Sequence, residues 1–495
     1  MKKIIRLLAL SLIFVSCTDL SEEFYDKIPG DQYPENAAQI ALETAPIYRP
    51  LQDFLDWGGW WFCQELPSDE VTCPTRDTDW DDGGKWRELH LHTWTPTTEA
   101  VASMWGRFYE GVGKINELLE KYEVPEGEEV DPEIAHILAQ LKVMRAYYYY
   151  LLIDNYGDVP YLTTFSDAPL NPGKDPKAFI FESIVAEIEA SIPDMKFSTS
   201  KTSVTRAMAF SVLAKLYLNA EVYTGEAYWE DASRVCDSII QMGVYSLESD
   251  PLAPFVTENS NSAENIFTIP YDRENYNGFN LHMRTLHYAH NLTFDMTVGP
   301  WNGFAAMEDH FNTYEEGDLR LAGFLVGEQF TSSGQPLMDN TAGSPVVLTP
   351  EIPALQMGSS YTPQEIRMSG ARVSKFEIEK GANENLSNDF PLFRYADILL
   401  MKAEALVRLN GPGSGDDFIN QVRNRADINS ISSATLDDIL EERGRELFWE
   451  AHRRQDLIRF GKFNDAWWEK SASDPSRNTF PIPQWVLDAN PNLSN

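Results

Sequence analysis

The most constraining feature of this chain is a helical spacing of apolar residues that returns in several separate segments. Between residues 98 and 122 the apolar positions step by three or four, as on one face of an α-helix; they are Val101, Trp105, Phe108, Val112, Ile115, Leu118 and Leu119. Comparable spacing predicts further helices at 132–153, 176–192, 205–221, 228–242, 391–409, 414–426 and 435–453. Paired amphipathic helices favour a mostly α, tetratricopeptide-like scaffold, although no consensus repeat of about 34 residues recurs.

The middle of the chain breaks this helical pattern. Residues 246–390 are rich in Pro, Gly, Asn, Ser and Thr and contain only short apolar runs, such as Ile266–Ile269. This composition predicts a large irregular, loop-rich insert with a few strands. No Gly/Ser-rich or Pro-rich linker divides the chain. We therefore expect one domain over residues 17–495, with its helical scaffold at about 98–245 and 391–460 and its loop-rich parts at about 50–97 and 246–390.

The N-terminus predicts export. Basic residues at Lys2, Lys3 and Arg6 precede a short apolar run that ends at Ser16–Cys17. Such a run is typical of a secretion signal and is too short for a permanent membrane span. The small residue before a cysteine resembles a bacterial lipoprotein box, which predicts that residues 1–16 are removed and that Cys17 carries lipid. An ordinary signal peptide cleaved nearby is the alternative.

The charge of the chain limits its ligands. The formal net charge is −36, and it becomes about −39 when the signal peptide, with three basic residues and no acidic one, is removed. A nucleic-acid-binding protein needs a basic face to displace counterions from phosphates, so the chain is not expected to bind nucleic acid. The same charge disfavours strongly anionic ligands such as sulfated glycans.

The cysteines and histidines leave one question open and predict no metal site. Cys63 and Cys73 lie ten positions apart, and in an oxidising compartment they could form a disulfide or remain thiols. His90 and His92 alternate as on one face of a strand, but no third metal ligand follows at a plausible spacing. Neither a phosphate-binding glycine loop nor a Gly-x-Ser-x-Gly nucleophile elbow is present. No metal or cofactor is expected.

Several motifs carry a resemblance to a known family. In the C-terminal part these are Pro391–Ala405 (PLFRYADILLMKAEA), Glu442–Glu446 (ERGRE), His452–Gly461 (HRRQDLIRFG) and Phe480–Pro483 (FPIP). In the N-terminal half they are Cys63–Glu70, Trp86–Pro96 and Leu218–Gly225. In this order they resemble the SusD/RagB family, nutrient-binding outer-membrane lipoproteins of Bacteroidetes.

This resemblance implies a fold, a location and a task. The fold would be four tetratricopeptide-like helix pairs with a loop-rich region laid against them. The protein would be lipid-anchored in the outer membrane on the extracellular side, where Ser21-Glu22-Glu23 resembles an export signal of surface lipoproteins. It would bind oligosaccharides and deliver them to a SusC-like TonB-dependent transporter. Tyr217, Asp397 and the Arg/Glu series at 441–459 would belong to the scaffold, and no catalysis is expected.

The candidate binding residues are aromatic. Sugars present C–H patches that pack on aromatic rings and hydroxyls that need polar partners. Seven of the thirteen tryptophans lie in a polar, Gly-broken stretch between Trp57 and Trp105. The resemblance assigns sugar stacking to Trp94, Trp301 and Tyr276, which we expect to meet on one face around a neutral oligosaccharide. Arg76, Asp77, Asp79 and Asn302 are the expected hydrogen-bonding residues.

Two other functions fit parts of this pattern. The same scaffold could capture a peptide or a protein instead of a glycan. A surface glycoside hydrolase would share the export signal, the aromatic residues and the acidity, but it needs two carboxylates at a defined separation.

Overall fold

The computed structural model describes residues 37–124 and 129–494. The chain divides into two compact units, Met1–Glu43 and Thr44–Asn495. Helix α2 (Ala37–Thr44) is the element described at the end of the first unit. The predicted signal peptide, Cys17 and Ser21-Glu22-Glu23 lie outside the described residues, so they remain predictions. The second unit contains all the elements discussed below.

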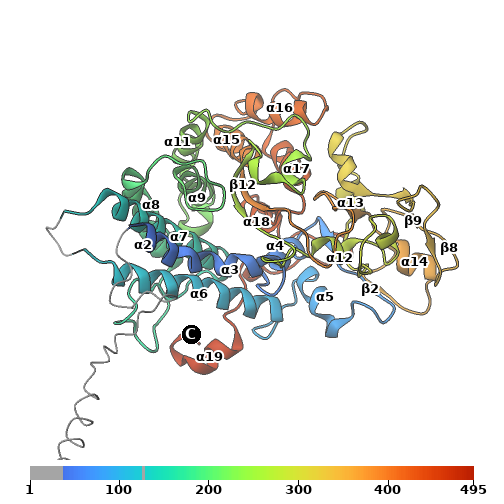
Figure 1. Cartoon of the computed structure of the whole chain (residues 1–495), viewed down its shortest axis with the longest axis horizontal. Coiled ribbons are helices and arrows are strands. Elements are labelled where there is room, and N and C mark those ends of the chain that lie inside the picture. Colours follow the sequence, from blue (N-terminus) through green and yellow to red (C-terminus); the bar gives the residue numbers. More distant parts are fainter. Residues whose placement is uncertain (1–36, 125–128, 495) are drawn as a thin grey trace, which may run out of the picture. The chain divides into compact units, whose positions relative to one another are not determined.

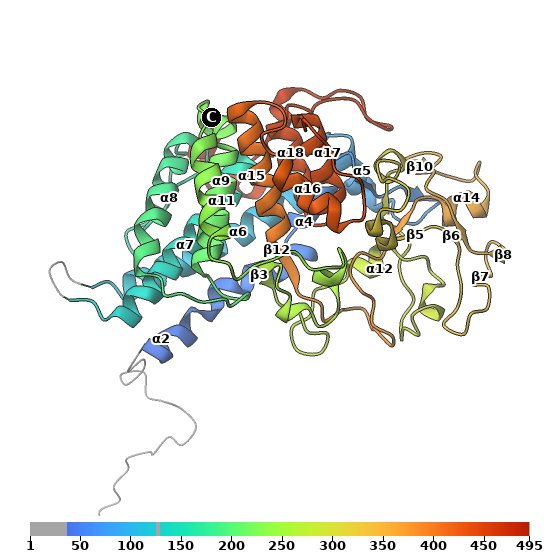
Figure 2. The same cartoon turned by 90° about the horizontal axis from the view of Figure 1, so that it is seen from above.

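Long helices build the scaffold of the second unit, as the spacing of apolar residues predicts. They are α6 (Glu99–Lys121), α7 (Pro132–Tyr156), α8 (Lys177–Ser191), α9 (Arg206–Leu218), α11 (Trp229–Ile240), α15 (Tyr395–Asn410), α16 (Asp416–Arg425) and α17 (Leu436–Leu447). Neighbours in the chain pack together, α6 on α7, α7 on α8, and α9 on α11, and α15 then packs on α11, α16 and α17. Figure 2 shows the resulting array of helices.

The ends of these helices follow from local sequence. Asp131 caps α7, where its side chain accepts a hydrogen bond from the Glu133 N–H, and Pro132 occupies the first turn. A single helix was expected at 435–453, but α17 ends at Leu447 and α18 (Arg453–Arg459) begins after a break. Trp449 and Ala451 have φ of 70° and 65° in this break. A left-handed backbone cannot continue an α-helix, and the spacing of apolar residues does not reveal it.

The start of the C-terminal helical segment also differs from the prediction. Residues expected to begin a helix at 391 form strand β12 (Phe390–Arg394), which pairs antiparallel with β3 (Asn265–Ile269). The helix α15 follows directly at Tyr395. Pairing with a strand more than a hundred residues away decides this conformation, and such pairing is not visible in a local window.

Outside the long helices and the β3–β12 pair, the described residues form only short strands and helices. The strand pairs are β1 (Val71–Thr72) with β4 (Ala305–Ala306), β2 (Thr75–Arg76) with β10 (Gln356–Met357), β5 (Phe324–Leu325) with β11 (Arg372–Val373), β6 (Gly327–Glu328) with β9 (Val347–Leu348), and β7 (Met338–Asp339) with β8 (Ser344–Pro345). The short helices are α3 (Arg49–Gln52), α4 (Trp60–Glu65), α5 (Lys85–His90), α10 (Ala220–Thr224), α12 (Leu281–Thr285), α13 (Glu308–Phe311), α14 (Pro363–Met368) and α19 (Gln484–Ala489). In Figure 1 the labels β8, β9 and α14 mark the insert on the right, and α8 and α11 mark the scaffold on the left.

A buried ionic cluster joins the strand pair to the scaffold. Arg394, which is 1% exposed, donates to Glu450 at 2.7 and 2.8 Å, to Glu446 at 2.6 Å and to Glu264 at 2.7 Å. Because Glu264 precedes β3 and Glu446 belongs to α17, one guanidinium connects three parts of the chain. The Glu series of this region is therefore structural, as expected.

The mostly α class is confirmed, and two local expectations are resolved. Cys63 and Cys73 are buried free thiols and form no disulfide. His90 lies in helix α5 and not in a strand. Among the described residues, no helix combines the length and the apolar character needed to cross a membrane.

Candidate functional site

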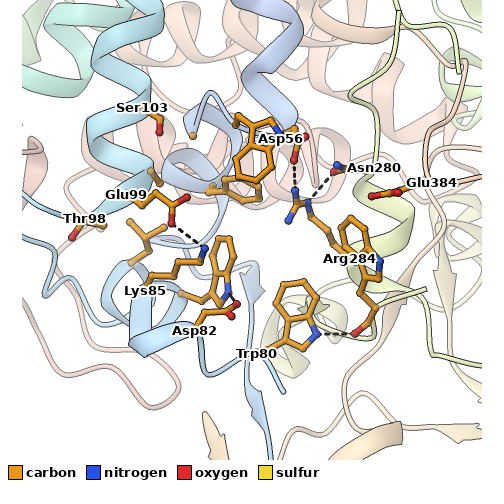
Figure 3. A pocket seen from close by; sticks show the side chains of 17 residues that line it. Asp56, Trp80, Asp82, Lys85, Thr98, Glu99, Ser103, Asn280, Arg284 and Glu384 are labelled. Carbon is orange, nitrogen blue, oxygen red and sulfur yellow. Dashed lines mark hydrogen bonds and ion pairs between the residues drawn. The ribbon is translucent and has the colours of Figure 1, made fainter. Parts of the chain in front are cut away.

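A cavity of about 410 Å³ opens where helices α4, α5 and α6 meet the loop-rich insert. Its lining is rich in aromatic side chains, with carboxylate, amide and cationic groups between them (Figure 3). The lining residues are Asp56, Trp57, Gly59, Phe62, Trp80, Asp82, Lys85, Trp86, Leu89, Thr98, Glu99, Ala100, Ser103, Asn280, Arg284, Trp301 and Glu384. Segments more than three hundred residues apart in sequence thus build one concave surface.

A strained turn holds one wall of the cavity. Trp80 and Asp82 have φ of 59° and 40°, and Gly83 and Gly84 follow at 68° and 89°. Non-glycine residues in this left-handed region cost free energy, and they persist where the surrounding structure over-determines them. The Trp80 indole N–H donates to the Trp301 carbonyl at 2.7 Å, which fixes the ring at the cavity. The hydrogen bond to Trp301, and not the strain itself, therefore holds the Trp80 ring in position.

The ring of Trp80 rests on a group of aromatic side chains. Its centroid lies 5.3 Å from that of Phe304 and 6.0 Å from that of Trp86. Trp86 is anchored in turn, because its indole N–H donates to Asp82 Oδ2 at 2.7 Å. Phe62 packs against Trp86 at 5.2 Å. Contacts among these protein side chains thus hold the floor of the cavity together.

Trp57 forms the most exposed wall of the cavity, with 68% of its surface accessible. It precedes Gly58 and Gly59 at the start of α4. A Cβ at Gly58 would lie 2.5 Å from the Asp53 carbonyl oxygen, and one at Gly59 would lie 2.2 Å from the Ala100 carbonyl oxygen. The two glycines allow this tight turn, and the turn leaves the Trp57 ring open to solvent.

Arg284 stands between the aromatic walls. Its guanidinium lies 4.7 Å from the Phe62 ring centroid and 5.4 Å from that of Trp301. It donates to Asp56 Oδ1 at 2.8 Å and to Asn280 Oδ1 at 3.0 Å. Burial lowers the pKa of Arg284 to about 10, so the group stays cationic at neutral pH.

The remaining charged groups lie nearer the solvent. Lys85 Nζ forms an ion pair with Glu99 Oε2 at 3.0 Å and lies 4.7 Å from the Trp86 ring centroid. Asp82 and Glu384 are exposed, and Figure 3 shows Glu384 beside Asn280. The site therefore combines apolar ring faces with carboxylate and amide groups. Among the described residues, no group of three or more His, Cys, Asp or Glu side chains is placed to hold a metal ion.

The structure brings only Trp301 of the predicted stacking residues into the cavity. Trp94 is 2% exposed and packs against Phe480 and His92 in the core, with centroids 4.7 and 4.9 Å away. The prediction that its ring stacks on a ligand is wrong, because no face of it reaches solvent. Tyr276 is 38% exposed but does not line the cavity. The three side chains therefore do not form one platform.

The predicted hydrogen-bonding residues do not line the cavity either. Arg76 and Asn302 are buried at 2% and 0% exposure, so their prediction as ligand contacts is wrong. Arg76 donates to the backbone carbonyls of Gly303 and Ile366, and Asn302 donates to that of Arg367. Asp77 and Asp79 are exposed outside the cavity, where Asp79 accepts a hydrogen bond from Tyr288.

The tryptophan-rich stretch of the sequence contains three residues of the lining, Trp57, Trp80 and Trp86. They were not among the predicted binding residues. The glycine pairs at 58–59 and 83–84 were the sequence signal that could have identified these tryptophans. Each pair turns the chain beside a tryptophan and brings its ring to the cavity.

These features define a class of protein: a tetratricopeptide-like helical scaffold that presents a preformed aromatic pocket. A model of the SusD family matches residues 360–495, and a family model described as "Starch-binding associating with outer membrane" matches residues 64–218. The chain belongs to the SusD-like family.

Relatives and solved structures agree with this assignment. The chain is 24% identical to the starch-binding protein SusD of Bacteroides thetaiotaomicron, over 87% of this chain and 84% of the relative. It is 24% identical to SusD-like protein P2 of Formosa agariphila, over 99% and 98%. Surface glycan-binding protein A of B. thetaiotaomicron, solved with laminarihexaose, shares the fold with a TM-score of 0.72 at 22% identity, over 91% of this chain and 97% of that one.

Proposed function

We propose that this protein binds an oligosaccharide in the aromatic cavity and delivers it to a SusC-like TonB-dependent outer-membrane transporter. The observation that carries this proposal is the combination of open tryptophan faces with carboxylate and amide groups in one cavity. Its volume of about 410 Å³ lies in the usual range for ligand sites. The strongly negative net charge favours a neutral glycan.

The rings and the polar groups have separate roles. Trp57 and Trp301 offer flat apolar surfaces on which the C–H faces of pyranose rings pack. Asp82 and Glu384 can accept hydrogen bonds from sugar hydroxyls, and Asn280 adds an amide to the lining. Because the floor is formed by Trp80, Trp86 and Phe62, little ordering of the protein is needed on binding.

The relatives support the same function. SusD is a starch-binding protein, and surface glycan-binding protein A was solved with laminarihexaose. Both names describe glycan binding. Members of the family work with SusC transporters in glycan uptake.

Two of the four carboxylates that line the cavity are held in ion pairs and are not available as a general acid. A glycosidase needs a protonated general acid and a second carboxylate that flank the scissile bond. Asp56 and Glu99, which line the cavity, are held in ion pairs with Arg284 and Lys85. The described carboxyls whose pKa is raised by burial are Glu65, Glu70, Glu264 and Asp389, and none of them lines the cavity.

We also propose the location given by the N-terminal sequence. Removal of residues 1–16 would leave Cys17 as the lipidated first residue, which anchors the protein in the outer membrane on its extracellular side. A lipidated N-terminus with more than one acyl chain gives stable anchoring. In this position the cavity can take up glycans before they reach the transporter.

Calorimetric titration of purified protein tests the site. Maltohexaose and laminarihexaose are suitable probes, and Trp57→Ala and Trp301→Ala should each weaken binding about tenfold, as the loss of a stacked ring implies. Trp485→Ala is the matched control, because Trp485 in α19 is 56% exposed and does not line the cavity. Circular dichroism checks the fold. Unchanged affinity in both cavity variants contradicts the proposed site, and binding of peptides in place of glycans contradicts the ligand class.

A further inference from the structure

The cations of the cavity are already engaged by the protein. Arg284 is buried between two aromatic rings and donates to Asp56 and Asn280. Lys85 pairs with Glu99 and lies over the Trp86 ring. A negatively charged ligand would have to break one of these interactions to gain a cationic partner. Neither basic side chain is therefore free to recognise an anion.

Two carboxylates of the lining have no cationic partner. Asp82 accepts a hydrogen bond from the neutral indole N–H of Trp86. No hydrogen bond or ion pair joins Glu384 to another of the described residues, and it acts on Arg284 only through space. Since the two ion pairs neutralise the other four charged groups, the lining carries an excess of two negative charges.

Hydrogen bonds hold the loop that carries Glu384. Asn383 Oδ1 accepts from the Asn385 N–H at 2.7 Å, and Asn385 Oδ1 accepts from the Gly278 N–H at 2.9 Å. Leu386 N–H then donates to the Phe279 carbonyl at 2.9 Å. These bonds fix the loop to the segment that carries Asn280, and Figure 3 shows the Glu384 side chain at the cavity.

We propose that Glu384 and Asp82 are specificity-determining residues that make the cavity select uncharged glycans and reject glycans carrying carboxylates. This inference rests on the proposed function of the cavity. It differs from the argument from net charge, because the discrimination arises from two named side chains at the site. A neutral sugar uses both groups as hydrogen-bond acceptors, whereas a uronic acid meets two like charges.

The size of the effect follows from Coulomb repulsion. Two unit charges about 5 Å apart in a water-like dielectric lower the affinity roughly fourfold. Both carboxylates acting together should therefore weaken a charged ligand by about tenfold or more relative to its neutral counterpart. The discrimination should shrink at about 1 M salt, where the Debye length is near 3 Å.

The test compares one hexasaccharide with its C6-oxidised derivative. Whichever of maltohexaose and laminarihexaose binds is titrated in both forms into wild-type, Glu384→Gln and Asp82→Asn protein. Asn tolerates the left-handed backbone of position 82 and keeps an acceptor for the Trp86 indole. The control Glu316→Gln removes the same charge from an exposed residue that does not line the cavity.

We expect wild-type protein to bind the oxidised form at least tenfold more weakly than the neutral form. Each cavity variant should narrow this ratio by about fourfold, and Glu316→Gln should leave it unchanged. Equal binding of both forms by wild-type protein overturns the inference, as does a ratio that both cavity variants preserve. If neither neutral hexasaccharide binds but an oxidised form does, the inference of selection for uncharged glycans is overturned. If none of the four ligands binds, the proposed function is overturned together with the inference.

Discussion

A single methyl group at position 303 should disturb the cavity without touching a ligand. An added Cβ at Gly303 would lie 2.4 Å from Cε2 of the Trp80 ring. Carbon atoms pack best at about 3.5–4.0 Å, so the ring or the backbone has to move by roughly 1 Å. The backbone is held, because the Gly303 N–H donates to the Arg284 carbonyl at 2.7 Å and the Gly303 carbonyl accepts from Arg76 at 3.3 Å. We therefore expect the Trp80 ring to move.

The displaced ring loses identifiable interactions. The hydrogen bond from Trp80 to the Trp301 carbonyl is worth about 0.5–1.5 kcal/mol. Overpacking of a closed site costs about 1–3 kcal/mol, and the aromatic contacts with Trp86 and Phe304 are part of that loss. Gly303→Ala should thus lower the free energy of unfolding by about 1–3 kcal/mol. Glycan affinity should fall roughly fivefold to tenfold, because one wall of the cavity is misplaced.

Chemical denaturation and calorimetric titration measure the two effects. Gly299→Ala is the matched control in the same loop, because a Cβ there meets only the Tyr288 carbonyl oxygen at 3.8 Å, an ordinary contact distance. It should leave both quantities near the wild-type values. If Gly303→Ala keeps wild-type stability and affinity, the contact between Gly303 and Trp80 does not position the cavity wall, and the reasoning is refuted.

Three further predictions concern stability, the transporter partner and anchoring. Burial raises the pKa of Glu65 to about 8 from its ordinary 4.5, so its contribution to stability is present below pH 4.5 and is lost as the pH rises toward 8. The variant Glu65→Gln still accepts a hydrogen bond from the Ala451 N–H. Chemical denaturation at several pH values should show that it loses less stability than wild type between pH 4.5 and 8. Parallel curves of unfolding free energy against pH for the two proteins would contradict this. In membrane fractions of the native host, wild-type protein should co-purify with a TonB-dependent barrel in mild detergent, and Cys17→Ala should leave the membrane; a Cys17→Ala protein still fractionating with membranes would defeat the lipid assignment.

Part of the site could be read from the sequence, and its exact membership could not. The concentration of tryptophans beside glycine pairs at 58–59 and 83–84 points to the segments that line the cavity, and Trp301 of the predicted stacking residues also lines it. Trp94 was placed wrongly, because a tryptophan in a polar loop has no local signal that distinguishes an exposed ring from a buried one. Its burial depends on Phe480, nearly four hundred residues later in the chain.

Local sequence determined the helices of this protein. A 3.6-residue period depends only on residues close together in the sequence. For this reason the scaffold from α6 to α11 follows the prediction within a few residues. Tertiary structure decided the strand at β12, the break between α17 and α18, and the composition of the cavity. Each of these depends on a partner distant in sequence: β3 pairs with β12, and Arg284 joins Asp56 across the cavity. The spacing of apolar residues cannot predict such partners, because their contacts exist only after the chain has folded.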